Sequence, residues 1–154
     1  MAQTNLNKQF GAVRVVDNTT FNTGGAGSST LKATDSGTHY NIDGTGNIVI
    51  TMPALSTDNV GVNYSFLVTT AVGAGTTTKF KCAAGGDFHA AITLTGNAST
   101  CTETFDAAGD TLTLPNGAVV GTRVNLLCVV DDGSSTQTWK AEAYGSPIAT
   151  VADS

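Results

Sequence analysis

The sequence predicts an all-β protein, a single antiparallel β-sandwich of jelly-roll-like arrangement with an extended N-terminal arm. Thr makes up about one residue in six, and the chain holds 18 Gly, a composition suited to many short strands joined by tight turns. Between residues 31 and 68, apolar and polar residues alternate, and turn signals interrupt the alternation. No apolar pattern of helical period persists over three turns, so we expect little or no helix.

The N-terminal segment differs in composition from the rest of the chain. Within it, only Phe10 to Val16 resembles a strand, and the sequence NTTFNTGGAGSST that follows is typical of a hinge. The segment has too few apolar residues for a core of its own, so we expect it to be mobile in isolation or ordered by lying on another surface. We therefore predict an arm and Gly/Ser-rich hinge over residues 1–30, a sandwich body over 31–146 and a short tail over 147–154.

The body contains ten segments with the period of two that is typical of strands. They are Thr30–Ala33, Thr38–Asp43, Asn47–Met52, Asn63–Thr70, Thr78–Cys82, Ala90–Thr95, Thr102–Phe105, Thr111–Leu114, Thr122–Val130 and Thr138–Tyr144. Asp43-Gly44 and Asp131-Asp132-Gly133 are interpreted as hairpin turns between successive strands. Strands of this length and number, separated by short turns, favour a sandwich.

The alternation also predicts the core. One face of each clearly alternating segment is apolar, and these residues are expected to meet between the sheets. They are Tyr64, Phe66, Val68, Ile92, Leu94, Leu112, Leu114, Trp139, Ala141 and Ala143. With 154 residues the chain is long enough to bury about 70 % of the surface that its unfolded form exposes, so the core needs no metal or disulfide to hold it.

No residue pattern indicates catalysis, a metal or a cofactor. His39 and His89 lack metal-ligand spacing, Cys82, Cys101 and Cys128 form no CxxC pair, and the sequence DDGSS does not match a calcium-binding loop. We expect a protein that is not an enzyme and needs no cofactor. A bridge between Cys82 and Cys101 stays open, because a reducing site of synthesis disfavours it without excluding it.

Two further possibilities are an enzyme that uses a pair of carboxylates and a protein that binds the phosphates of nucleic acid. A pair of distant carboxylates for glycoside hydrolysis is a weak alternative, since Glu103 and Glu142 are the only glutamates. Residues 31–154 carry five basic and eleven acidic side chains, and no Lys or Arg cluster that would bind phosphates, so nucleic acid is not an expected partner.

Membrane and export signals are also missing from the pattern. No apolar run reaches the roughly 20 residues of a membrane span, and the N-terminus MAQTNLNKQF has no apolar signal core. We therefore expect synthesis in a cytoplasm, without export by the general secretory route. Only 12 % of residues are charged, about half the usual share, and a neutral polar surface of this kind suits assembly with other subunits.

Several short motifs follow one another along the chain: L-x-x-x-D-S-G-x-x-[FY], T-[LM]-P-A, G-x-x-Y-x-F-x-V, V-G-x-x-V-x-L and a terminal Trp strand. The residues that form them are Leu31, Asp35, Ser36, Gly37, Tyr40, Thr51, Met52, Pro53, Ala54, Gly61, Tyr64, Phe66, Val68, Val120, Gly121, Val124, Leu126 and Trp139. They cover about half the chain, and together they resemble a pattern of head decoration (cement) proteins, small all-β virion proteins of tailed bacteriophages.

The resemblance implies a virion structural protein on the outer surface of a phage capsid. Its partners would be the major capsid protein, whose neighbouring subunits it would clamp, and two further copies of itself in a homotrimer. We expect the arm to make the capsid contact, because its apolar residues have no core of their own. The expected contact residues are Phe10, Val13, Arg14, Val15 and Phe21. The alternative is a fibre or receptor-binding module that recognises a host glycan through Ala71–Thr77 or Asp131–Gln137.

Overall fold

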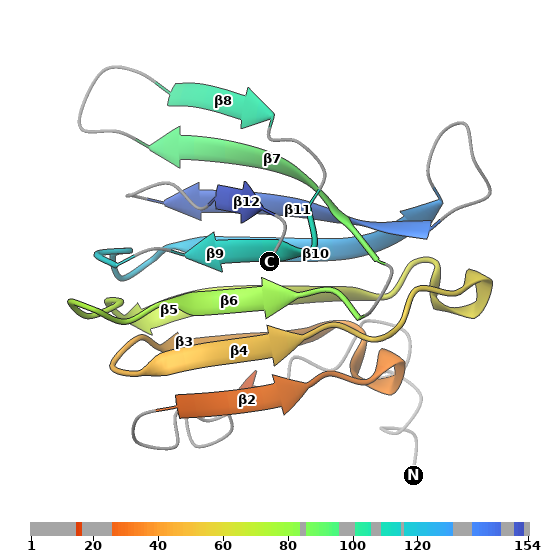
Figure 1. Ribbon diagram of the computed structural model, residues 1–154, viewed down its shortest axis with the longest axis horizontal. Helices are drawn as coiled ribbons and strands as arrows, with labels where there is room; N and C mark the ends of the chain where they lie inside the picture. Colours follow the sequence, from red (N-terminus) through yellow and green to blue (C-terminus); the bar gives the residue numbers. More distant parts are fainter. Residues whose placement is uncertain are drawn as a thin grey trace, which may run out of the picture.

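Two β-sheets packed face to face make up the computed structural model of the protein (Figure 1). The structure describes residues 15–16, 26–83, 86–95, 101–105, 109–114, 116–130, 137–145 and 150–152. Helical structure in these ranges is limited to two short 3-10 turns, at Ala33–Asp35 and Thr57–Asn59. The same ranges contain no helix with the length and hydropathy needed to cross a membrane. The protein is thus all-β, as the sequence predicts.

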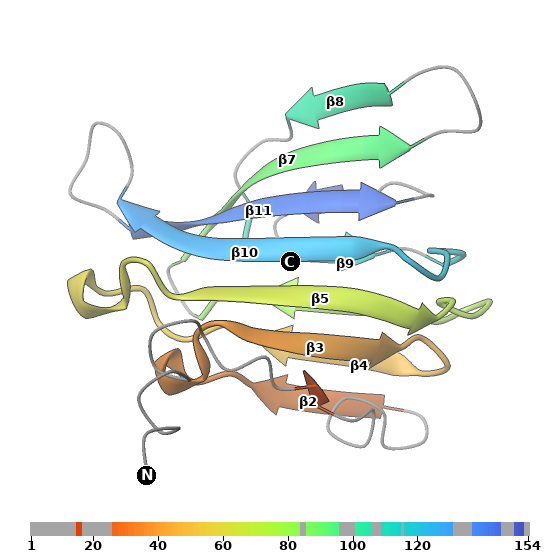
Figure 2. The same ribbon diagram turned by 180° about the vertical axis from the view of Figure 1, so that it is seen from behind.

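The larger sheet has seven strands in the order β1, β3, β5, β10, β11, β7, β8. Their bounds are β1 Val15–Val16, β3 Thr38–Asp43, β5 Asn63–Thr70, β10 Arg123–Val130, β11 Gln137–Gly145, β7 Phe88–Thr95 and β8 Cys101–Phe105. The smaller sheet has five strands in the order β12, β9, β6, β4, β2. Their bounds are β12 Thr150–Ala152, β9 Thr111–Leu114, β6 Thr78–Lys81, β4 Asn47–Thr51 and β2 Ala26–Thr30. Figure 1 has the five-stranded sheet in front, and Figure 2 has the seven-stranded sheet in front.

The strand directions correct the prediction of an antiparallel, jelly-roll-like sandwich. The pairs β1/β3, β3/β5, β2/β4, β4/β6 and β7/β11 are parallel, whereas a jelly roll is built from antiparallel strands. For the pairs among β2 to β6, the reason is that these strands alternate between the two sheets, so each strand returns to its own sheet one full circuit later and in the same direction. Antiparallel pairing occurs later in the chain, at β5/β10, β10/β11, β6/β9, β9/β12 and β7/β8.

The turn at Asp43-Gly44 is therefore not the predicted hairpin. It connects β3 in the larger sheet to β4 in the smaller one, and the two strands do not pair with each other. The local turn chemistry is the same in both cases, which is why the sequence does not distinguish them. The predicted hairpin between β10 and β11 fits the antiparallel pairing of these strands, and its residues 131–136 lie outside the described ranges.

Both ends of the chain contribute strands that the sequence analysis assigned to non-strand segments. Ala26–Thr30, within the predicted arm and hinge, forms β2 and pairs with β4. The segment predicted as strand Thr30–Ala33 instead leads from β2 into a 3-10 turn. Thr150–Ala152, within the predicted tail, forms β12 and pairs with β9. These segments are short of apolar residues, so pairing with an existing sheet edge, and not their own pattern, makes them strands.

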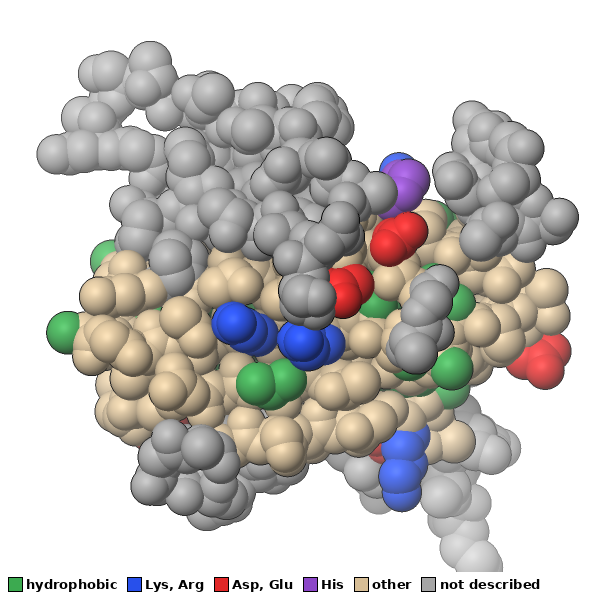
Figure 3. All heavy atoms as spheres, in the orientation of Figure 1, with side chains coloured by type: hydrophobic (Ala, Val, Ile, Leu, Met, Phe, Trp, Pro, Cys, Tyr) green, Lys and Arg blue, Asp and Glu red, His purple; other side chains and the backbone are tan. Residues whose placement is uncertain are grey.

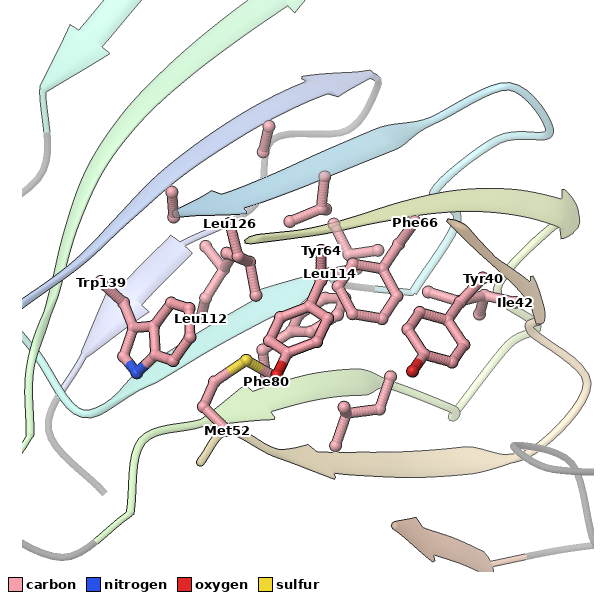
Figure 4. Close-up of a cluster of buried hydrophobic side chains, with 14 of the residues drawn as sticks. Tyr40, Ile42, Met52, Tyr64, Phe66, Phe80, Leu112, Leu114, Leu126 and Trp139 are labelled. Carbon is pink, nitrogen blue, oxygen red and sulfur yellow. The ribbon is translucent and has the colours of Figure 1, made fainter. Parts of the chain in front are cut away.

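The other predicted strands agree with the structure to within about two residues, and the predicted core is confirmed where it is described. Tyr64, Phe66, Val68, Leu112, Leu114, Trp139, Ala141 and Ala143 are all buried. Trp139 is the largest fully buried side chain and lies at one end of the cluster in Figure 4. The side chains of Ile92 and Leu94 lie outside the described set.

Aromatic rings connect the two sheets through the middle of this core (Figure 4). The rings of Tyr40 and Phe66 stack with centroids 5.3 Å apart, and Phe66 meets Phe80 edge-on at 4.7 Å. Tyr40 and Phe66 come from β3 and β5, and Phe80 comes from β6 in the other sheet. Such ring pairs contribute about 0.5–1.5 kcal/mol beyond the area they bury. The contact thus holds successive circuits of the chain and both sheets together.

Gly44, in the turn where the chain passes from β3 in one sheet to β4 in the other, offers the first test of the fold. A Cβ atom at Gly44 would lie 2.6 Å from the backbone of Val72, whereas one at Gly73 would come no closer than 3.5 Å to any neighbour. We predict that Gly44→Ala lowers the free energy of unfolding by about 1–3 kcal/mol through overpacking. The matched variant Gly73→Ala should change it by less than about 0.5 kcal/mol. Urea unfolding followed by circular dichroism measures both, and equal effects would contradict the close approach of Gly44 to the Val72 backbone.

Trp139 offers a second test, of the core itself. Trp139→Ala should lower the free energy of unfolding by about 3–5 kcal/mol, because it removes the largest fully buried side chain and leaves a cavity. Trp139→Phe keeps most of the ring volume and should lose clearly less. The two variants are compared in the same urea titration, and a loss below about 1 kcal/mol for Trp139→Ala would show that this end of the core is not packed as described.

Candidate interaction surface

The seven-stranded sheet faces the viewer in Figure 2. On its outer face, residues of neighbouring strands line up in rows that cross the sheet. In one row, His39 of β3, Ser65 of β5, Asn125 of β10 and Glu142 of β11 are neighbours in register. The row on one side joins Asn63, Leu127, Lys140 and His89, and the row on the other joins Asn41, Leu67, Arg123 and Tyr144. The sheet thus gathers residues from four or five segments that are far apart in sequence.

Two hollows lie on this face. The first, here called the corner hollow, has a volume of about 510 Å³ and lies where the turn before β10 meets the end of β11. It is lined by Val119, Val120, Gly121, Thr122, Arg123, Asn125, Tyr144 and Gly145. The second, the mid-sheet hollow, has a volume of about 390 Å³. It is lined by Asn63, Tyr64, Ser65, Asn125, Leu126, Leu127, Lys140 and Glu142, so Asn125 belongs to both.

Apolar groups at the corner hollow are unusually open to solvent. Val119 is 48 % exposed and Val120 is 61 % exposed, in a turn whose glycines Gly117 and Gly121 both have positive φ. Tyr144 is 37 % exposed, and its hydroxyl donates a hydrogen bond of 3.0 Å to Glu142 Oε2. Exposed apolar side chains that gather rather than scatter are typical of a binding surface.

The outer face of the smaller sheet is different in character. Figure 3 shows it as mostly uncharged, with a few basic and acidic side chains. Two of the basic ones, Lys79 and Lys81, lie on β6. Neither of the two hollows reaches this sheet, since their lining residues come from β5, β10, β11 and the turn before β10.

The two histidines lie on strands of the larger sheet that are not neighbours. His39 in β3 hydrogen-bonds through Nδ1 to the Ser65 hydroxyl, a contact between strands that the sequence analysis missed because 26 residues separate the pair. An imidazole that is hydrogen-bonded to a hydroxyl has the arrangement of a base and a nucleophile. In the part of the chain that is described, however, no third group orients the His39 ring. His89 lies in β7, and Asp131 and Asp132 lie outside the described residues.

Metal-binding groups are dispersed as well. Across the described ranges, no three His, Cys, Asp or Glu side chains gather closely enough to hold a metal ion. Cys82 and Cys128 are free thiols, so the bridge from Cys82 that the sequence left open does not form in this structure. Burial, assisted by the nearby carboxylates Asp87 and Asp110, raises the pKa of the Cys82 thiol to about 12.

The residues expected to contact a capsid fall mostly outside the description. Phe10, Val13, Arg14 and Phe21 are in ranges that the structure does not describe. Val15 is placed with Val16 in β1, whose backbone pairs in parallel with His39 and Tyr40 of β3. The arm therefore meets the body at one edge of the seven-stranded sheet, on the far side of β3 from the two hollows.

Comparison of the chain with protein-family models, with curated proteins and with solved structures found no match.

Cys82 provides a test of the local environment. Its raised pKa leaves the thiol protonated at pH 8, and only the thiolate reacts with alkylating agents, so we predict that iodoacetamide modifies Cys82 at least about 100-fold more slowly in the native protein than in urea. Because the unfolded chain loses this proton at lower pH than the folded one, stability should fall as the pH rises above about 9. Peptide mass mapping identifies the modified cysteine, and equal native and unfolded rates would contradict the burial.

Proposed function

We propose that the protein is a virion structural protein that decorates the outside of a phage capsid and stabilises contacts between major capsid protein subunits. Support comes from the motif resemblance, the all-β two-sheet body and the low share of charged residues. Capsid decoration requires binding surfaces and no catalytic groups, and the described residues provide such surfaces.

The observation that carries the proposal is the position of β1. Val15 and Val16, the residues before β2 that the structure describes, pair in parallel with β3 at a sheet edge. A sheet edge presents unpaired N–H and C=O groups, and extending one with a strand is a common mode of protein recognition. In the proposal, the arm that joins the body at this edge makes the capsid contact.

Assembly of three copies strengthens this attachment. Subunits with few charged residues meet without burying unpaired ions. In a homotrimer, three arms act together, so modest individual contacts give a high effective affinity. A ligand that binds the assembled shell and not the free subunits stabilises the shell by mass action.

The second candidate, a fibre or receptor-binding module, is favoured by the exposure of one predicted recognition loop. Ala71, Ala74 and Gly75 are exposed at the tip of the connection between β5 and β6. The other predicted loop, Asp131–Gln137, lies outside the described residues except for Gln137. The two candidates differ in where the protein sits on the particle and in how many copies it has there.

Truncation of the arm tests the proposal. Deleting residues 1–14 removes Phe10, Val13 and Arg14 but keeps β1, and deleting residues 1–25 removes β1 as well and keeps β2. We expect both truncated proteins to stay folded by circular dichroism and to lose binding to empty capsids of the encoding phage in a sedimentation assay. Normal decoration by the shorter deletion would contradict the proposal.

Two point variants in the full-length chain provide the matched control. Arg14→Ala should weaken capsid binding by about tenfold, because a guanidinium that pairs with a carboxylate contributes more than a typical neutral hydrogen bond. Lys8→Ala removes a positive charge from the same arm, outside the predicted contact set, and should leave binding unchanged. Equal losses would mean that net charge, and not a specific contact, drives the interaction.

A further inference from the structure

We propose that the outer face of the seven-stranded sheet is a saccharide-binding site centred on Tyr144, with the corner hollow and the mid-sheet hollow as adjoining subsites. The proposal goes beyond capsid decoration and does not depend on it, because it concerns a different face of the body from the edge where the arm joins.

The orientation of Tyr144 is the first step. Glu142 and Tyr144 are two residues apart on β11, so their side chains leave the same face of the sheet about 6.5 Å apart. The Tyr144 hydroxyl nevertheless reaches back to Glu142 Oε2 at 3.0 Å. The Tyr144 side chain therefore leans along the strand toward Glu142, and Tyr144 is 37 % exposed. An exposed aromatic ring offers an apolar surface on which the C–H face of a pyranose can stack.

The polar groups around this ring are those that bind sugar hydroxyls. Arg123 is the cross-strand neighbour of Tyr144, and Asn125 is the cross-strand neighbour of Glu142. The guanidinium offers only donors, the carboxylate offers only acceptors, and the amide offers both. Vicinal hydroxyls each donate and accept, so this set satisfies them in pairs without a metal or a covalent step.

Thr122 adds an independent observation at the corner hollow. Its side chain is 2 % exposed, and its hydroxyl has no hydrogen-bond partner among the residues described. A buried hydroxyl without a partner is destabilising, and this one belongs to a residue that lines the corner hollow. Thr122 packs directly against Gly145, where any Cβ atom would collide with its side chain. The small residue at 145 thus leaves room for the Thr122 side chain in the wall of the hollow.

The mid-sheet hollow extends the site toward a second sugar ring. It shares Asn125 with the corner hollow and adds Lys140, Glu142 and the amide of Asn63. Both volumes, about 510 and 390 Å³, lie in the range of small-molecule sites, which is roughly 300–1,000 Å³. Two open hollows in a line along β10 fit a chain of linked rings better than one compact, apolar ligand.

Isothermal titration of the full-length chain with three trisaccharides tests the proposal: chitotriose and cellotriose as neutral probes, and trigalacturonate as an acidic one. We expect at least one to bind with a dissociation constant in the millimolar range or tighter. Tyr144→Ala should weaken that binding by about tenfold or more, whereas Tyr144→Phe, which keeps the ring, should stay within about threefold. Circular dichroism checks that both variants fold.

A matched pair of lysine variants locates the site. Lys140→Ala, in the mid-sheet hollow, should weaken binding of the probe, and Lys79→Ala, on the other sheet, should not. Failure of all three probes to bind overturns the proposal, as does binding that Tyr144→Ala leaves unchanged. This face could instead bind the capsid protein. That result would appear as loss of decoration by Tyr144→Ala in a protein that binds no sugar, and it would also overturn the proposal. These results are separate from those of the arm truncations.

Discussion

The fold depends on close stacking of the corners where the chain passes from one sheet to the other. Gly44 N–H donates to Thr70 C=O at 3.0 Å, and Gly73 N–H donates back to Gly44 C=O at 3.0 Å. Val72 in turn exchanges hydrogen bonds with the next corner, donating to Ala118 C=O and accepting from Gly117 N–H, each at 2.9 Å. The corners β3–β4, β5–β6 and β9–β10 are thus joined by their backbones at one end of the sandwich. The first two run from the larger sheet to the smaller, so their strands pair in parallel, whereas the third runs back to the larger sheet, so β9 and β10 pair antiparallel with β6 and β5.

The same stacking determines where the surface features lie. Since the corners use their backbone groups on each other, the side chains of the last corner are free to face outward, and Val119 and Val120 are exposed there. That corner leads directly into β10, whose partner β11 ends beside it. The corner hollow therefore arises where a stacked turn meets the central strands of the larger sheet.

The strands and core could be predicted from sequence because they rest on a local pattern. The alternation of Tyr64, Phe66 and Val68 marks one buried face whichever strand lies alongside. The sheet to which a strand belongs is not encoded in that period, so the Asp43-Gly44 corner had the pattern of a hairpin. The strands β2 and β12 have little apolar pattern and are strands only because neighbouring edges accept them.

The candidate surface could not be predicted for a related reason. Tyr144, Arg123 and Asn125 come from two strands, and only the register of β10 with β11 places them together. Glu142 was weighed in sequence as one of two carboxylates for hydrolysis, whereas the structure places it in the outer face of β11, bonded to the Tyr144 hydroxyl. Side-chain types alone did not indicate this arrangement, because it depends on which strands are neighbours.

Attachment of the protein to a capsid in regular array is the central claim, and the copy number in purified virions tests it most directly. Quantitative gel densitometry against the major capsid protein gives that number. A decoration protein should be present in a molar amount comparable with that of the major capsid protein. A few copies per particle would contradict the account and would favour a fibre or receptor-binding module instead.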